Sequence, residues 1–250
     1  MKISAVVITK NEEEKIERCL KGLSFCDEVV VIDDCSTDKT IELAKKYKAQ
    51  VFEREMVGDF SQQRNFGMEK CSGDWIVFVD ADEEVSDELR EEIVEKLLKV
   101  SEDVSGYNIR RIDSFFGKQI KHGESGNIYL TRIVKTGKGV WKRRVHETLS
   151  VKGKVDLLKN PLIHNKSEDL FRLVSRINLQ SELHAKAIYE EGKKSSLVKI
   201  IAWPIGKFIR NYIFKLGFLD GLAGFVFAML ISMHSFLSWS ELWLRQKHLK

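Results

Sequence analysis

Short apolar runs alternate with helix-like segments along the first hundred residues, and this order constrains the fold more than any other feature. The runs are continuously apolar and rich in β-branched residues, as in strands covered on both faces; they fall at residues 3–8, 28–32, 51–52 and 75–79. Helical patterns occupy residues 11–20, 37–48, 60–68 and 86–99. Strands that alternate with helices predict an α/β fold, with a mostly parallel, twisted sheet flanked by helices.

Three of the predicted strands end in polar clusters. Thr9-Lys10-Asn11 follows the first strand, Asp33-Asp34 ends the second, and Asp80-Ala81-Asp82 follows residues 75–79. Ligands of parallel α/β sheets bind beyond the carboxyl ends of the strands, so we expect these clusters to meet at one edge. Two carboxylates spaced like Asp80 and Asp82 can hold one Mg²⁺ or Mn²⁺ together with phosphate oxygens.

These residues also have purely structural interpretations. Asp80 and Asp82 could be acids that favour the dipole of the helix that follows them. Either Asp33 or Asp34 could cap the next helix, although a cap explains only one of the two. Arg64 could pair with a phosphate through its planar guanidinium group, or be a solvated charge on a helix surface.

Taken together, these segments resemble glycosyltransferase family 2, whose members have the GT-A fold. The matching segments are residues 6–13, 31–38, 63–67 and 73–83, in the order and spacing of the family. Within the family, the chain is similar to the lipopolysaccharide core-biosynthesis glucosyltransferase group, through residues 145–147, 162–164 and 217–224. The resemblance implies a metal-dependent hexosyltransferase that uses a nucleotide-sugar.

The resemblance also implies roles for individual residues. Those expected to bind the nucleotide-sugar are Thr9, Asn11, Glu12, Asp33, Asp34, Arg64, Asp80 and Ala81. Those expected to hold Mg²⁺ or Mn²⁺ are Asp80, Asp82 and, as an additional ligand, His164. A lone histidine beside apolar residues is otherwise a structural one.

Glu147 is the candidate general base, because a carboxylate near the attacking hydroxyl can drive an inverting, single-displacement transfer. The alternative interpretation of Glu147 is an exposed acid beside Arg143 and Arg144. Cys35 stands where the family commonly has glycine, and the loop should accept it if the φ angle there is negative.

The expected reaction is the inverting transfer of a hexose from a UDP-sugar or related donor to a lipid-linked saccharide, such as lipopolysaccharide core. A polyprenyl phosphate is the alternative acceptor. A nucleotidyltransferase would also pair acids around a metal, but the chain lacks a glycine-rich, basic loop near its N-terminus. A non-catalytic membrane scaffold with a degenerate site is the remaining alternative.

The predicted domains are a GT-A catalytic domain at residues 1–165 and a helical region at residues 166–250. Residues 1–100 form the nucleotide-binding half of the catalytic domain. Residues 101–165 form the acceptor half, where short alternating segments broken by glycines predict antiparallel strands.

The apolar segment at residues 197–244 predicts membrane association. Its stretch 221–240 lacks formal charges and is just long enough to span a bilayer. Three interpretations stay open: a monotopic or re-entrant attachment, a single span, and a buried or dimerising helical hairpin, whose dimerising form would make the protein a homo-oligomer.

The net charge of +4 resides in residues 203–250, which hold six Lys or Arg and two acids. This placement suits an anionic leaflet and argues against a nucleic-acid groove. The four cysteines match no zinc pattern, and reduced thiols are expected. We therefore expect a peripheral or monotopic protein at the cytoplasmic face of the inner (plasma) membrane, with a single span as the alternative.

Overall fold

The computed structural model describes residues 1–115, 118–124, 128–143, 147–166 and 170–247. The chain divides into two compact units. Residues 1–111 and 128–165 form the first, and residues 112–127 and 166–250 form the second. Residues 112–127 thus group with the C-terminal helices, although the sequence placed them within the acceptor half.

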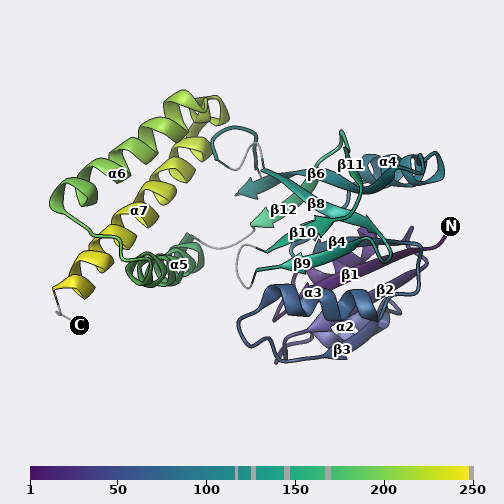
Figure 1. Cartoon of the computed structure of the whole chain (residues 1–250). Coiled ribbons are helices and arrows are strands. Elements are labelled where there is room, and N and C mark those ends of the chain that lie inside the picture. The colour runs from purple at the N-terminus through teal and green to yellow at the C-terminus, as the bar shows by residue number, and fades with distance from the viewer. Residues whose placement is uncertain (116–117, 125–127, 144–146, 167–169, 248–250) are drawn as a thin grey trace. The chain divides into compact units, whose positions relative to one another are not determined.

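A mixed sheet is the framework of the first unit, and the predicted GT-A-type α/β class is confirmed (Figure 1). Its strand order is β3-β2-β1-β4-β8-β6-β12-β5, with β11 also paired to β6. The end of β6 and its partner β7 belong to the second unit. Strands β1 to β4 pair in parallel, and β8 continues the sheet antiparallel to β4. The strands are β1 (Ile3–Thr9), β2 (Glu28–Asp33), β3 (Gln50–Glu53), β4 (Trp75–Asp80), β5 (Glu83–Glu84), β6 (Val104–Phe115), β7 (Lys118–Ile120), β8 (Ile128–Lys135), β11 (Lys154–Leu157) and β12 (Leu162–Lys166).

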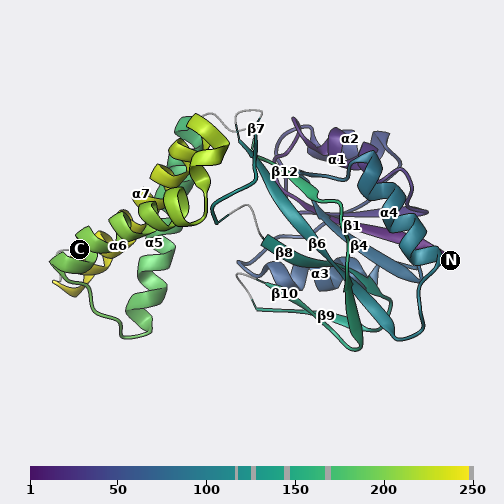
Figure 2. The same ribbon diagram turned by 90° about the horizontal axis from the view of Figure 1, so that it is seen from above.

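Alternate residues of the central strands feed two apolar cores. Ala5 and Val7 of β1 pack towards helices on one face, whereas Val6 packs towards the other. Helices α1 (Ile16–Gly22), α2 (Thr40–Lys46) and α4 (Asp87–Leu98) cover the first face. Helix α3 (Phe60–Glu69) and the two-stranded ribbon of β9 (Gly139–Lys142) and β10 (Thr148–Val151) cover the second, as Figure 2 shows.

The register of the parallel strands brings the three polar clusters to one edge of the sheet. Thr9 pairs with Asp33 across β1 and β2, and Ile8 pairs with Asp80 across β1 and β4. The carboxyl ends of the three strands are therefore level. This edge is where open α/β sheets bind ligands.

The structure removes the helix-terminus interpretations of the acidic pairs. Helix α4 begins beyond β5, and its N-cap is Ser86, whose side chain accepts a hydrogen bond from the Leu89 amide. Helix α2 begins at Thr40 with no side-chain cap at Lys39. The acids at the ends of β2 and β4 therefore do not cap helices. The first helix was also predicted too early, because it begins at Ile16.

The second unit is a helical assembly. It comprises α5 (Leu170–Glu190), α6 (Leu197–Ile209), a π-helical turn η2 (Arg210–Phe214), a 3₁₀ turn η3 (Gly217–Asp220) and α7 (Gly221–Gln246). Helix α7 packs against both α5 and α6 (Figure 1). Among the described residues, the helical stretch 217–246 is the one long and apolar enough to cross a membrane. Length and composition alone are weak evidence for a span.

Candidate active site

A buried arginine joins the ends of β4 and the ribbon. Arg64 of α3 is 2% exposed, so it is not the solvated helix charge that was the alternative. Its Nη2 donates to Asp80 Oδ1 at 2.8 Å and to Glu147 Oε1 at 3.0 Å. The guanidinium group also lies 4.6 Å from the centre of the Trp141 ring, a cation–π contact worth about 0.5–2 kcal/mol.

Each residue of the Gln63-Arg64-Asn65 segment makes a different tertiary contact. The side-chain amide of Gln63 donates a hydrogen bond to the backbone oxygen of Arg54 and accepts one from the Arg54 guanidinium group. Asn65 exchanges two with the backbone of Trp141. The segment therefore fixes α3 to the ribbon and holds Arg64 between them.

Arg132 of β8 is a second buried arginine, and the sequence analysis missed it. Its Nη2 donates to Asp80 Oδ2 at 2.9 Å and to Glu83 Oε1 at 3.1 Å. Glu83 Oε2 in turn accepts the Asp80 amide at 2.9 Å. An arginine beside the apolar residues of a predicted strand was the available signal, but its partners lie 52 and 49 residues away in the sequence.

These ion pairs set the protonation of the site. Burial raises the pKa of Asp80, but Arg132 and Arg64 outweigh it and hold that pKa well below its usual value. Burial dominates at Glu83 and raises its pKa despite Arg132. Asp80 is therefore an anion whose two oxygens are both occupied by arginines.

Asp82 and His164 form the pair that fits a divalent cation. Asp82 Oδ2 and His164 Nε2 are 3.0 Å apart, brought together by the antiparallel pairing of β5 with β12. Burial opposes ionisation of Asp82, but His164 outweighs it, so the pKa of Asp82 is lowered. The Asp82 carboxylate suits Mg²⁺ or Mn²⁺ when phosphate oxygens and water complete the shell, and the adjacent His164 offers a nitrogen ligand.

The described residues contain no group of three or more His, Cys, Asp or Glu placed to hold a metal. The predicted third ligand, Asp80, is engaged by Arg64 and Arg132. A cation here would therefore depend on the phosphate groups of a ligand, which is the usual arrangement for Mg²⁺ in nucleotide sites.

The acids at the end of β2 have separate partners. Asp34 Oδ2 accepts from Lys10 Nζ at 2.8 Å, and its Oδ1 accepts the Met56 amide at 2.7 Å. Asp33 is fully buried and accepts both the amide and the hydroxyl of Ser36. Asp33 thus shapes the loop, whereas Asp34 lies at the edge where β1 ends.

The remaining predicted nucleotide ligands surround this edge. Thr9 is buried, and its hydroxyl has no hydrogen-bond partner within the described chain. Asn11 accepts the Thr37 amide through Oδ1, and Glu12 pairs with Lys15. Ala81 is buried directly beyond β4.

Cys35 departs from its prediction. Its φ angle is +52°, in the left-handed region, so the negative angle that would have made it acceptable does not occur. Glycine fits this conformation better than any other residue, so the side chain of Cys35 strains the loop.

A pocket of about 460 Å³ opens beside the ion pairs. Its lining includes Asp80, Arg132, Trp141 and Glu147. Glu147 pairs with Arg64, so it is not merely an exposed acid beside Arg143. Residues 144–146, which carry part of the predicted 145–147 match, lie outside the described residues.

Comparison with known proteins decides the family. The family model for glycosyl transferase family 2 matches residues 4–151, more than half of the chain. The chain belongs to this family. It is therefore a glycosyltransferase, and the enzyme class expected from the sequence is confirmed.

Relatives extend this similarity over almost the whole chain. An uncharacterized glycosyltransferase from Rickettsia bellii is 30% identical, over 96% of this chain and 86% of the relative. The lipopolysaccharide core biosynthesis glycosyltransferase LpsC from Rhizobium meliloti is 29% identical, over 97% of this chain and 92% of the relative.

Among solved structures, residues 1–349 of TarS from S. aureus share the fold with a TM-score of 0.51 at 17% identity. The alignment covers 99% of this chain and 92% of that structure. The GT-A architecture is thus supported from the solved structures as well as from the sequence.

Proposed function

We propose that this family 2 enzyme moves a hexose, with inversion, from a UDP-sugar to a lipid-linked saccharide such as lipopolysaccharide core. The observation that carries the proposal is the meeting of Asp82 and His164 with the Arg64–Asp80 ion pair at the end of β4. The Asp82–His164 pair has the chemistry to hold a cation against a diphosphate. Asp80 and Glu147 line one pocket.

The donor occupies the edge where β1, β2 and β4 end. Asp34 accepts hydrogen bonds from the nucleoside, either in place of the hydrogen bond from Lys10 or in addition to it. The buried Thr9 hydroxyl, which lacks a partner among the described residues, supplies another polar contact. Asn11, Glu12, Asp33 and Ala81 shape or line the same edge.

Asp82 and His164 would hold Mg²⁺ or Mn²⁺ at the donor site. The bound cation would neutralise the charge that develops on the leaving nucleoside diphosphate. Asp80 approaches the ribose and can join the metal ligands only if it gives up one arginine contact. Arg64 and Arg132 therefore set the position of Asp80.

Glu147 is the general base of the proposed reaction. Arg64 engages its Oε1, and no described residue forms a hydrogen bond to its Oε2. Oε2 takes the proton of the acceptor hydroxyl while that hydroxyl oxygen attacks the anomeric carbon from the face opposite the diphosphate. Attack from that face inverts the configuration at the anomeric carbon.

The similarity to LpsC supports the saccharide acceptor, because its name assigns it to lipopolysaccharide core biosynthesis. The long apolar helix and the basic tail support work at a membrane surface. We place the enzyme at the cytoplasmic face of the plasma membrane, where its four free cysteines stay reduced.

The test is a transfer assay with the purified full-length chain, Mn²⁺, a panel of nucleotide-sugars and two acceptors, a core saccharide and a polyprenyl phosphate. We expect the saccharide to be glycosylated, with the anomeric configuration inverted. Glu147→Gln should lower kcat by about 10²–10⁴-fold. Glu95→Gln, an exposed carboxylate on α4, is the matched control and should keep full activity.

Two results would overturn parts of this proposal. Transfer to the polyprenyl phosphate alone, giving an acid-labile product soluble in organic solvent, would replace the acceptor. Full activity of Glu147→Gln would remove Glu147 as the base and leave the donor site untouched.

A further inference from the structure

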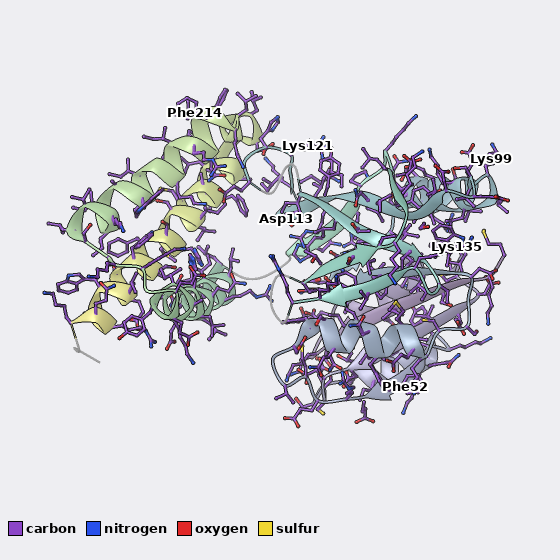
Figure 3. All side chains as sticks on the ribbon, in the orientation of Figure 1. Phe52, Lys99, Asp113, Lys121, Lys135 and Phe214 are labelled. Carbon is purple, nitrogen blue, oxygen red and sulfur yellow. The ribbon has the colours of Figure 1, made fainter. Side chains whose placement is uncertain are left out.

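The outer side of α6 has the wrong polarity for a helix that faces water. Its exposed apolar side chains recur at helical spacing and are Leu197, Val198, Ile201, Ile205 and Ile209. The apolar surface continues over η2 and η3, where Phe214 is labelled in Figure 3. A surface helix of a soluble protein carries polar residues on this side, and large exposed apolar patches mark interaction sites. We call this surface the outer α6 face.

The opposite side of α6 is already occupied by α7. Pro204 is buried, and its carbonyl oxygen accepts a hydrogen bond from the Ser232 hydroxyl at 2.7 Å. Trp203 and Trp239 stack with their ring centres 6.1 Å apart. These contacts fix which side of α6 faces outwards.

The charges carried by the segment that forms the outer α6 face have one sign. Residues 197–219 contain no Asp or Glu and four cations, Lys199, Lys207, Arg210 and Lys215. Glu124 pairs with two of them, Lys207 and Arg210, and Lys199 and Lys215 add two further positive charges. An apolar surface on a segment that carries only cations suits an anionic bilayer, where each group finds its preferred environment.

We propose that the outer α6 face lies in the headgroup region of an anionic lipid bilayer, with α6 parallel to the membrane plane. The inference rests on the proposed function and deepens it, since it identifies the surface that holds the enzyme beside a lipid-linked acceptor. It assigns membrane contact to α6 rather than to α7, the helix long enough to span a bilayer.

Helix α5 argues against a span by α7. The two helices pack along one another, and Arg245 of α7 pairs with Glu182 of α5. Helix α5 also carries Arg176, Lys186 and Glu190. Moving α7 across the bilayer would draw these charges into the hydrocarbon or break the packing, and both are costly.

Vesicle flotation of the full chain tests the proposal. The vesicles contain phosphatidylcholine alone or with about one-third phosphatidylglycerol, a composition chosen because basic segments bind anionic lipid. The test variant is I201E/I205E, whose residues are 53% and 54% exposed. The matched control is L179E/L183E on α5, where both leucines are 58% exposed.

We expect the wild type to float with the anionic vesicles and to be released by alkaline carbonate. I201E/I205E should bind at least about tenfold more weakly, because two isoleucines that would enter the bilayer become charged. The control should bind like the wild type. Circular dichroism and donor hydrolysis, measured without lipid, should be unchanged in both variants, which separates loss of membrane binding from failure of folding or of the catalytic proposal.

Several results would overturn the proposal. Equal flotation of I201E/I205E and wild type would show that the outer α6 face does not bind lipid. Resistance to carbonate would favour a span. The wild type could instead fail to float and form a dimer without lipid, with I201E/I205E a monomer. That result would assign the outer α6 face to a second copy of the chain. None of these results would touch the nucleotide-sugar site, whose activity is read separately.

Discussion

Replacing Arg132 by methionine tests whether the buried ion pairs at the end of β4 organise the site. The substitution keeps much of the side-chain volume and removes the charge 2.9 Å from Asp80 and 3.1 Å from Glu83. Asp80 still pairs with Arg64, whereas the cation left beside the fully buried Glu83 is Arg111, at 3.9 Å. Removing one partner of a buried ion pair typically costs about 3–5 kcal/mol, and we expect about 3 kcal/mol because Arg111 remains.

Glu83 supplies the internal control. Burial already raises its pKa, so without Arg132 it should take up a proton, and the stability defect of Arg132→Met should shrink as the pH is lowered. Glu83→Gln removes the second charge and leaves an oxygen that can still accept the Asp80 amide. The double variant R132M/E83Q should therefore be about 2 kcal/mol more stable than the sum of the two single effects.

Equilibrium urea unfolding of the full chain provides the free energies, with tryptophan fluorescence as the probe, since Trp141 lies against Arg64. A defect below about 1 kcal/mol in Arg132→Met, or strict additivity in the double variant, would refute the reasoning. The variant should also raise the KM for the donor, because Asp80 loses one of the two arginines that orient it.

Three further predictions concern the framework of the site. Burial raises the pKa of Glu28, but hydrogen bonds from Ser4 and Ser72 outweigh it and lower the pKa to about 2. The stability that the ionised Glu28 carboxylate contributes is present above about pH 4.5 and is lost as the pH falls towards 2. The loss of unfolding free energy in Glu28→Gln, measured against wild type in urea, should therefore shrink over that interval. Cys35→Gly should leave the free energy of thermal unfolding unchanged or raise it by about 1 kcal/mol, since φ is +52°. A loss above about 1 kcal/mol would show that Cys35 does not strain the loop. Gly67→Ala should destabilise by about 1–3 kcal/mol in urea, because the new Cβ would lie 2.5 Å from a Val6 methyl group, and a neutral result would mean that α3 can shift on the sheet.

The parallel half of the fold was predictable because its signals are local. Each buried strand is a continuous apolar run, and each run stops where the chain turns polar at the sheet edge. The convergence of Thr9, Asp33 and Asp80 followed from topology alone, before any contact was known.

The rest depended on pairings that the local pattern does not encode. Arg132 and Glu83 meet only because β8 pairs antiparallel with β4, 49 residues apart in the sequence. The grouping of residues 112–127 with the helices rests on contacts still more distant in the sequence, such as His122 with Asp220, 98 residues apart. The left-handed conformation of Cys35 was unpredictable because residue type reports only a preference for φ.

The assignment of Asp82 and His164 to a divalent cation joins the catalytic proposal to the structure most directly. The two side chains lie 3.0 Å apart, and phosphate oxygens would have to complete the shell of an ion that they hold. The most direct measurement is calorimetric titration of the wild type, Asp82→Asn and the exposed control Asp87→Asn with UDP, with and without Mn²⁺. We predict that Mn²⁺ increases the affinity for UDP by at least about tenfold in the wild type and in the control, and has little effect in Asp82→Asn. Binding of UDP that is indifferent to Mn²⁺ in the wild type, or equally enhanced in Asp82→Asn, would contradict the account.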